Sequence, residues 1–514
     1  MKLLPTLIGA LLIWISPVTY QLQQYTKDLG AYHGYWQQNL YALNSAFGTD
    51  ADLKALANEL HSRNMSLMLD VVVNDFAWAG AGTSVDYTKF NPFNNEDYFH
   101  QYRLQSSDVN NNTCVEECWL GDTVVSLPDL KTETPQVSSM LCTWAQEMIS
   151  NYSVDGLRID SVFNVNPDFL SGFNNAANVF CIGEGSTKNV TAACSLQGQL
   201  NGMLNYPLYY ALTGAFNSTN GSLSDLMTTV NRVNSSCKDI FELGTFSENH
   251  DVPRFASYTN DLSVSRHPKQ NKETTIYKEM KQRRKQKALM VSSWPVTLSH
   301  ILYLEMESQL VIYNGQEQHY SGAFNPVNRE AVWLSSYNEN APLYKVIQSL
   351  NQIRSHAAGN GSQFTESSEP SQDYIEYLSY PFITQTHILA LRKGFKGNQV
   401  IMVLSNLGSN PASSEDTNAA LPASQTGFHP SQNVTEILSC KTVTTDSSGQ
   451  LNISLNDGGP RVYYPTLSLN QSGLCGHLVA GSTKSGAWYG RDIHSVTWFI
   501  SLAGTIYLAV YILF

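Results

Sequence analysis

The sequence predicts an α/β protein: a (β/α)8 TIM barrel with an inserted irregular subdomain, followed by a C-terminal antiparallel β-sandwich domain. Short apolar strands alternate with helical stretches over residues 12–365, as in a parallel barrel. Residues 75–128 are rich in Asn, Asp and Gly, and they are too many for an ordinary connection, so we expect an inserted subdomain there. From residue 366 to 475 the pattern changes to short strands and turns, which predicts antiparallel sheets.

The first helix of the barrel is expected at residues 51–61. Leu53, Leu56, Ala57 and Leu60 recur at helical spacing and would form one apolar face. Asp50 is a candidate N-cap. This pattern indicates a helix that packs on the barrel and has no chemical role.

A short apolar strand at residues 156–160 carries two charged residues. Side chains alternate along a strand, so Arg158 and Asp160 point to the same side. Charged groups at the end of a buried strand are costly unless they pair or carry out chemistry. Taken alone, the pattern fits either a structural ion pair or part of a functional site.

Three further apolar strands end in polar side chains: Asn74, Glu184, and the pair His250 and Asp251. In a parallel barrel these strand ends meet on one face, where loops build the site. The alternative for Glu184 and Asp251 is that they cap neighbouring loops. Acids from three strands, with two nearby basic groups, are typical of enzymes that cleave glycosidic bonds. That set comprises Asp160, Glu184, Asp251, Arg158 and His250.

The composition favours a polar, uncharged ligand. Of the 514 residues, only 14% are charged and 11% are aromatic, which suits sugars that stack on aromatic rings. The net charge of −12 argues against a nucleic-acid partner.

Both ends of the chain are apolar. Residues 1–20 have the charge and apolar run of a signal peptide, although residues 12–19 also suit a barrel strand. Residues 495–514 form an uncharged run of about twenty residues, long enough to cross a bilayer. With the preceding linker at 476–494 and its small residues, this run resembles a GPI-attachment signal; the alternative is a retained tail anchor. We therefore expect an extracellular protein held at the cell surface or cell wall, with a membrane as partner.

Sequons for N-glycosylation agree with a secreted glycoprotein. They begin at Asn64, Asn111, Asn151, Asn189, Asn217, Asn220, Asn234, Asn360, Asn433, Asn452 and Asn470.

Several motifs occur in a shared order and spacing. They are DVVVN (70–74), SLPDL (126–130), GLRIDSV (156–162), CIGE (181–184), FSENHDVPRFASYTND (246–261), IYNGQEQHYSG (312–322) and NPVNREAVWLS (325–335). Together they resemble the α-amylase family, glycoside hydrolase family thirteen, and most closely its fungal GPI-anchored branch of amylase-like enzymes and α-glucanotransferases.

Two departures from the family pattern affect the expected fold. Family members carry a strand and helix before the position matched by residues 12–19, so the first barrel strand is expected to be missing. Residues 262–311 are longer than the family pattern requires, and 265–287 are dense in Lys, Arg and Gln. This stretch is either a basic surface loop or sequence foreign to the fold.

The resemblance implies a role for each polar residue of the site. Asp160 would be the nucleophile, Glu184 the general acid/base and Asp251 the stabiliser that grips sugar hydroxyls. Charge pairing with Arg158 would favour the ionised form of Asp160. The apolar run before Glu184 suits a raised pKa and the acid role. The further substrate contacts implied are Arg158, His250, Arg329, Asp75 and Tyr35, whose ring would stack on the sugar or, alternatively, pack in the core.

Three residues depart from the family at this site. Asp75 stands where the family usually has His, and Phe163 and Asn164 stand where it usually has Lys and His. These changes remove a donor and a cation. We expect altered handling of substrate or water, with transfer to a second sugar as one outcome.

The resemblance also implies a Ca²⁺ cofactor. The side chains of Asn74 and Asp129 and the backbone oxygens of Glu116 and Asn164 match the ligand positions, and all are the hard oxygen donors that calcium prefers. The alternative is a hydrogen-bond network of Asn and Asp around the subdomain.

Eight cysteines fit an oxidising compartment. Cys114 and Cys118 can pair, although their spacing is tight. The resemblance implies disulfides of Cys194 with Cys237 and of Cys440 with Cys475. Cys142 and Cys181 would then be buried thiols.

The sequence therefore predicts a retaining, endo-acting enzyme that hydrolyses or transfers α-1,4-glucosidic bonds of an α-glucan polysaccharide or oligosaccharide. The alternative from another class is a non-catalytic glucan-binding protein of the cell wall. The presence of all three acids, Asp160, Glu184 and Asp251, favours the enzyme.

Overall fold

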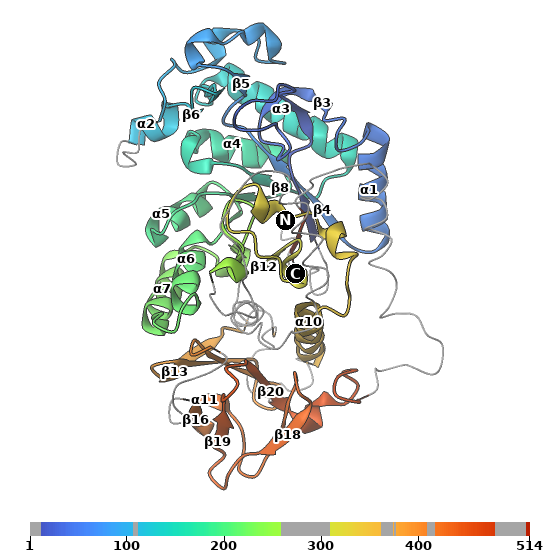
Figure 1. Ribbon diagram of the computed structural model, residues 1–514, viewed down its shortest axis with the longest axis vertical. Helices are drawn as coiled ribbons and strands as arrows, with labels where there is room; N and C mark the ends of the chain where they lie inside the picture. Colours follow the sequence, from blue (N-terminus) through green and yellow to red (C-terminus); the bar gives the residue numbers. More distant parts are fainter. Residues whose placement is uncertain are drawn as a thin grey trace.

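The computed structural model describes residues 12–105, 112–258, 309–360, 374, 377–408 and 417–477, and the backbone of 510–513. A barrel domain and a β-domain are stacked along the long axis, with α10 (Pro342–Asn360) beside their junction (Figure 1). The basic stretch at 265–287 and the linker at 476–494, apart from residues 476 and 477, lie outside the described residues.

Eight strands form the closed sheet of the barrel. Their order is β10 (Gly202–Met203), β9 (Phe180–Gly183), β8 (Gly156–Ile159), β4 (Ser66–Val71), β1 (Leu12–Ile15), β21 (Val510–Leu513), β12 (Gln309–Tyr313) and β11 (Gly244–Thr245). A bridge between Leu204 and Gly244 joins the two ends of this order. Every neighbouring pair is parallel except those that involve β21. The predicted fold class is confirmed.

The barrel position expected to lack its first strand is occupied by β21, the last described segment of the chain. The backbone of β21 runs antiparallel to both β1 and β12, with Ile512 opposite Ile13 on one side and Ile312 on the other. Without it, both neighbours would present unpaired backbone groups at an open edge. A tail removed during anchor attachment could not also occupy this place, so the anchor stays a prediction of the sequence. Within the described ranges, no helix is both long and apolar enough to cross a membrane.

Helices cover the outside of the barrel. They are α1 (Asp50–Ser62), α3 (Pro135–Tyr152), α4 (Pro167–Ala177), α5 (Val190–Ser195), α6 (Tyr206–Phe216) and α7 (Leu223–Ser236). α1 packs Leu53, Ala57 and Leu60 inward, as its spacing predicts, and Leu56 at the side of this face is partly buried. Its N-cap is Thr49 rather than Asp50, because Thr49 and Asp52 form a reciprocal capping box.

The segment between β4 and α3 is irregular. It holds β5 (Trp78–Ala79), α2 (Asn112–Glu117), β6 (Leu120–Gly121) and β7 (Val125–Leu127), and its aromatic core is formed by Phe76, Phe90, Phe93 and Phe99. The hairpin of β2 (Thr19–Gln21) and β3 (Gln37–Leu43) packs against this segment, where Leu40 N–H donates to the carbonyl oxygen of Asn91.

All three disulfides anticipated from the sequence are formed: Cys114–Cys118, Cys194–Cys237 and Cys440–Cys475. Cys181 is a buried thiol as expected. Cys142 is only partly buried, because it lies on α3 at the edge of the face that packs on the barrel.

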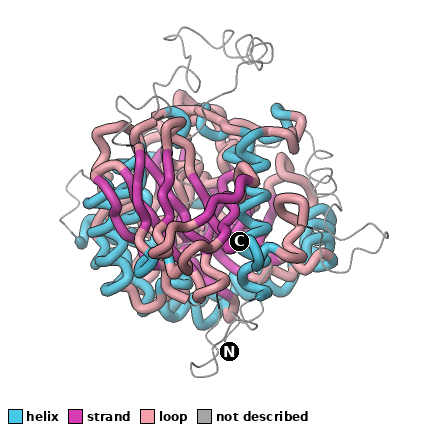
Figure 2. The backbone as a smooth tube through the Cα atoms, turned by 90° about the horizontal axis from the view of Figure 1, so that it is seen from below, coloured by secondary structure: helices cyan, strands magenta, loops and turns pink. Residues whose placement is uncertain are grey.

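The β-domain is a sandwich, as predicted. One sheet has the order β13 (Tyr380–Gln385), β14 (Ile388–Lys393), β15 (Val400–Ser405), β20 (Arg461–Pro465), β17 (Asn433–Glu436) and β18 (Lys441–Thr444). The other pairs β16 (Asn418–Leu421) with β19 (Leu451–Ser454). Seen from the β-domain end, the strands fill the middle of the view and helices lie around them (Figure 2).

β15 has both faces buried, which explains its unbroken apolar sequence. Ile401 and Val403 belong to the core between the two sheets. Val400, Met402 and Leu404 point to the other face and join a core shared with α6, α7 and α10. The two domains are therefore held together by a continuous apolar core.

Asn406 adds a polar contact between the domains. Its side-chain amide donates to the carbonyl oxygens of Ala215, at 3.1 Å, and Gly221, at 2.8 Å. Its Oδ1 lies 2.9 Å from Nδ1 of His387. One buried side chain thus ties the α6–α7 connection to the β-domain.

We predict that Asn406→Ala lowers the free energy of unfolding by about 2 kcal/mol, since one buried and one partly buried carbonyl group lose their donor. Urea unfolding followed by tryptophan fluorescence measures this. Lys441→Ala, at an exposed position on β18, is the control and should change stability by less than about 0.5 kcal/mol. Equal stability of the two variants would contradict the assigned role.

Candidate active site

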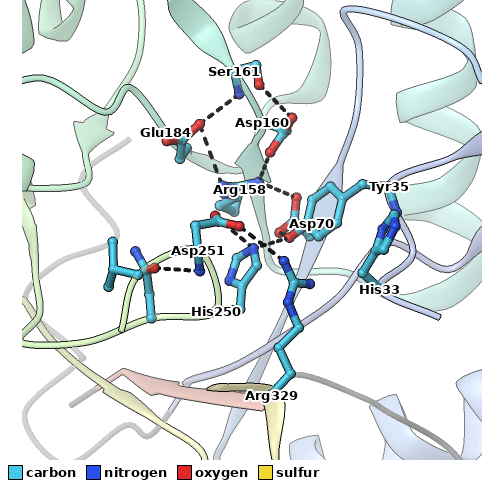
Figure 3. Close-up of polar contacts among 12 residues, drawn as sticks. His33, Tyr35, Asp70, Arg158, Asp160, Ser161, Glu184, His250, Asp251 and Arg329 are labelled. Atoms are coloured by element: carbon cyan, nitrogen blue, oxygen red, sulfur yellow. Dashed lines mark hydrogen bonds and ion pairs between the residues drawn. The ribbon is translucent and has the colours of Figure 1, made fainter. Parts of the chain in front are cut away.

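The site is built around the buried guanidinium group of Arg158 on β8. Its Nη1 lies 2.9 Å from Oδ1 of Asp70 and 2.5 Å from Oδ1 of Asp160, and its Nη2 lies 3.7 Å from Oε2 of Glu184 (Figure 3). The register explains this meeting, because Asp70 on β4 and Ile182 on β9 are the pairing partners of Arg158. The charged pair first seen in the sequence is therefore both an ion pair and the centre of a cluster of acids.

Asp160 and Glu184 lie at the ends of neighbouring strands; the side chain of Asp160 is 17% exposed and that of Glu184, nearly buried, is 11% exposed. Burial raises the pKa of Glu184 to about 7, and the charge of Arg158 opposes this rise. Ser161 contacts both acids: its hydroxyl donates to Oδ2 of Asp160 at 2.8 Å and its backbone N–H to Oε2 of Glu184 at 3.0 Å.

Asp251 lies across from these acids on the loop after β11. Nη2 of Arg329 donates to its Oδ1 at 3.2 Å, and Nε2 of His250 lies 3.0 Å from its Oδ2. Its side chain is 41% exposed, the most open of the three acids. Nδ2 of Asn328 donates to the carbonyl oxygen of His250 at 2.9 Å and so fixes the loop.

Tyr35 links His250, which lies beside Asp251, to Asp70 in the cluster of acids around Arg158. Its hydroxyl donates to Oδ2 of Asp70 at 2.6 Å and lies 2.8 Å from Nε2 of His250. The Tyr35 and His250 rings are parallel, with an interplanar angle of 8°. Burial, followed by the charges of Arg329 and Arg158, lowers the pKa of His250 well below its usual value, so the imidazole is neutral.

Asp70 is a site residue that was not predicted. It accepts hydrogen bonds from Arg158, from Tyr35 and from Nε1 of Trp14, the last at 3.1 Å. Burial raises its pKa to about 7, against the effect of Arg158. The sequence feature that could have identified Asp70 is an acid within an otherwise apolar strand, because a buried acid costs free energy unless partners are provided.

Two of the residues that depart from the family pattern, Asp75 and Phe163, lie near Asp160 and Glu184. Asp75 is only 3% exposed and accepts a hydrogen bond from Nδ2 of Asn74 at 3.2 Å, so its direct contact with sugar stays a prediction. Burial and the charge of Asp160 raise the pKa of Asp75. A Cβ at position 185 would lie only 2.4 Å from Cε2 of Phe163. The Phe163 ring therefore requires a glycine at position 185.

The contacts of the residues implied for calcium define two pairs. Asn74 and Asp129 are neighbours, because Leu130 N–H donates to the carbonyl oxygen of Asn74 at 2.8 Å. Nδ2 of Asn164 donates to the carbonyl oxygen of Val115 at 2.9 Å, which places Asn164 against the helix that carries Glu116.

Two buried oxygens of this set have no hydrogen-bond donor within the described part of the chain: Oδ1 of Asn74 and Oδ2 of Asp129. Burial raises the pKa of Asp129 to about 7, while His100, 2.8 Å from its other oxygen, lowers it. Oxygens left without a donor fit a cation. Over the described ranges, no three His, Cys, Asp or Glu side chains form a metal cluster, so amide and backbone oxygens would have to complete the shell.

Comparison with known proteins identifies the family. Residues 6–356 match the alpha amylase catalytic domain, and residues 381–483 match alpha-amylase domain C. The chain belongs to the α-amylase family. It is 40% identical to Alpha-amylase 2 of Schwanniomyces occidentalis over 468 residues, covering 91% of this chain and 83% of that protein. It is 37% identical to the α-amylase of Saccharomycopsis fibuligera over 458 residues, covering 89% and 82%.

Solved structures agree with this assignment. The α-amylase from Malbranchea cinnamomea matches this α-amylase-family chain with a TM-score of 0.76 and 40% identity, covering 90% of this chain and 87% of that one. The α-amylase from Geobacillus thermoleovorans, solved in complex with acarbose, is 21% identical with a TM-score of 0.67 over 89% and 88%, and it shows the same fold. The predicted enzyme class, a glycoside hydrolase of this family, is confirmed; the GPI-anchored branch stays a prediction.

We predict that kcat/KM on an α-1,4-glucan falls as the pH rises through about 7. Burial raises the pKa of Glu184 to about 7, and an acid that donates a proton must be protonated. Measuring kcat/KM for short maltooligosaccharides as a function of pH tests this fall. Activity that stays constant from pH 6 to about 9 would exclude Glu184 as the proton donor.

Proposed function

We propose that this protein is a retaining, endo-acting enzyme of α-1,4-glucosidic bonds, and that it transfers sugar to a second sugar as well as to water. The observation that carries the proposal is that one guanidinium group, that of Arg158, contacts both Asp160 and Glu184. A shared guanidinium keeps the two carboxyl groups on one side of the site, which supports a retaining mechanism, in which the two carboxyl groups lie about 5 Å apart.

The first step uses both acids. An oxygen of Asp160 attacks C1 of the sugar, and the bond from C1 to the leaving oxygen breaks as Glu184 donates its proton to that oxygen. Arg158 and Ser161 hold the nucleophile in place through its two oxygens. Asp251, oriented by Arg329, is placed to bind hydroxyl groups of the same sugar.

The second step releases the sugar. Glu184, now a carboxylate, takes a proton from a hydroxyl group that attacks C1, and Asp160 leaves as a carboxylate. The hydroxyl belongs to water in hydrolysis and to a sugar in transfer. Asp75 and Phe163 replace the family's His and Lys beside these groups, and we infer that water is less well positioned and a sugar competes better.

A non-catalytic glucan-binding protein is the second candidate. It would have no use for a cluster in which burial raises the pKa of Glu184 to about 7 while Asp160 remains accessible. Perturbed acids at the C-terminal end of barrel strands indicate chemistry rather than binding alone.

We also propose that Asn74 and Asp129, with the backbone oxygens of Glu116 and Asn164, hold a calcium ion. The support is the two buried oxygens described above. When bound, the ion would neutralise charge and hold the segment after β4 against the barrel. The catalytic steps themselves do not pass through it.

We predict that adding calcium to chelator-treated protein raises the melting temperature, and that Asp129→Ala abolishes the response. Binding to the folded state alone stabilises by about 2.7 kcal/mol at a hundred times Kd. Glu96→Ala, an exposed acid of the same segment, is the control and should respond like the wild type. Differential scanning fluorimetry measures the melting temperature. A wild-type melting temperature that does not change with calcium would refute the proposed calcium site.

We predict that incubation with maltoheptaose yields both longer and shorter oligosaccharides, as transfer requires. Chromatography of the products decides: only shorter products would mean hydrolysis, and no products would favour a binding protein. NMR of the first product should show retained α configuration, and an inverted product would contradict the mechanism.

Glu184→Gln removes the proposed proton donor and should lower kcat on the order of 10²- to 10⁴-fold. It also controls for activity from a contaminating enzyme. Glu147→Gln, exposed on α3, is the matched control and should leave the rate unchanged.

A further inference from the structure

Ser161 follows the nucleophile and contacts both catalytic acids. Its hydroxyl donates to Oδ2 of Asp160 at 2.8 Å, and its backbone N–H donates to Oε2 of Glu184 at 3.0 Å (Figure 3). Arg158 occupies the other oxygen of Asp160. Both oxygens of the nucleophile therefore accept a hydrogen bond, one from a cation and one from a neutral hydroxyl.

The backbone at Ser161 is left-handed, with φ 51° and ψ 43°. This conformation costs on the order of 1 kcal/mol for a residue with a Cβ, and glycine adopts it freely. The turn lets the N–H point at Glu184 while the side chain returns to Asp160. A glycine would make the same turn without strain but could not supply the hydroxyl that donates to Asp160.

The charge of the hydroxyl's acceptor changes during the reaction. In the proposed mechanism Asp160 attacks as a carboxylate and is a neutral ester once it is bonded to C1. A hydrogen bond to a charged acceptor is roughly twice as strong as one to a neutral acceptor. The Ser161 hydroxyl therefore stabilises the free carboxylate more than the ester, whichever oxygen forms the bond.

We propose that Ser161 is a positioning residue that favours release of Asp160 from the glycosyl-enzyme. This inference rests on the retaining mechanism proposed above. In the release step the incoming hydroxyl oxygen bonds to C1, its proton passes to the Glu184 carboxylate, and the bond from C1 to Asp160 breaks with its electron pair going to Asp160. The Ser161 hydroxyl strengthens its hydrogen bond as that negative charge returns.

Two variants separate the hydroxyl from the backbone. Ser161→Ala removes the hydroxyl and keeps the strained Cβ, whereas Ser161→Gly removes the hydroxyl and relieves the strain. Both keep the backbone N–H that donates to Glu184. A role of the hydroxyl predicts the same kinetic change in both variants, whereas a purely conformational role predicts that they differ.

α-Maltosyl fluoride is the probe, because its good leaving group makes formation of the glycosyl-enzyme fast. In both variants kcat should fall on the order of tenfold, since one charge-assisted hydrogen bond is lost in the release step. KM should fall by the same factor as the intermediate accumulates, leaving kcat/KM within about twofold of the wild type. Rapid-quench mass spectrometry should show a larger fraction of covalently modified chain.

Three results would overturn the proposal: an unchanged kcat, a fall in kcat/KM equal to that in kcat with KM unchanged, or full activity in Ser161→Gly alone. Thermal melting of each variant identifies a variant that fails to fold, and the kinetics of the other variant then decide. An inverted product or no fluoride release by the wild type would instead refute the retaining mechanism, so the two failures are distinguishable.

Discussion

The buried charge of Arg158 is the constraint on which the site depends. A guanidinium with no exposed side-chain surface is very costly unless acids surround it. Asp70, Asp160 and Glu184 do so, but three acids against one cation leave surplus negative charge in a poorly solvated place. This surplus adds to burial in favouring a proton on the cluster near neutral pH, as the raised pKa values of Glu184 and Asp70 show.

That electrostatic need explains how the neighbouring residues are used. Tyr35 and Trp14 direct their donors at Asp70, and Tyr35 carries the network on to His250 and so to Asp251. The site is therefore a connected set of hydrogen bonds across several strand ends, and a change at one member reaches the others. Ser161 extends this connection to Asp160 and Glu184, the acids proposed to act on the sugar.

The barrel's closure is a second constraint. The strand order places β21 between β1 and β12, where a parallel strand is expected in this family. Backbone groups at that gap need partners, and an apolar segment of any direction can provide them. The shared core beneath α6, α7 and α10 then holds the β-domain against the closed barrel.

The sequence by itself determined the alternation of strands and helices, the sandwich domain, and the three acids Asp160, Glu184 and Asp251. These depend on local patterns: the period of apolar residues, and polar residues where strands end. The family resemblance added the disulfide pairs Cys194–Cys237 and Cys440–Cys475 and the roles proposed for the acids. It did not reveal Asp70, whose partners are Trp14, Tyr35 and Arg158, residues brought to it from other parts of the chain.

Only the tertiary structure decided which acid shares which donor, where β21 pairs, and that Ser161 reaches Asp160 and Glu184 together. Asp50 was the predicted N-cap of α1, and only the side-chain geometry shows that Thr49 fills that position. The physical reason is the same in each case. Hydrogen bonds and burial depend on distances between atoms, and those are set by strand register and chain direction rather than by residue type alone.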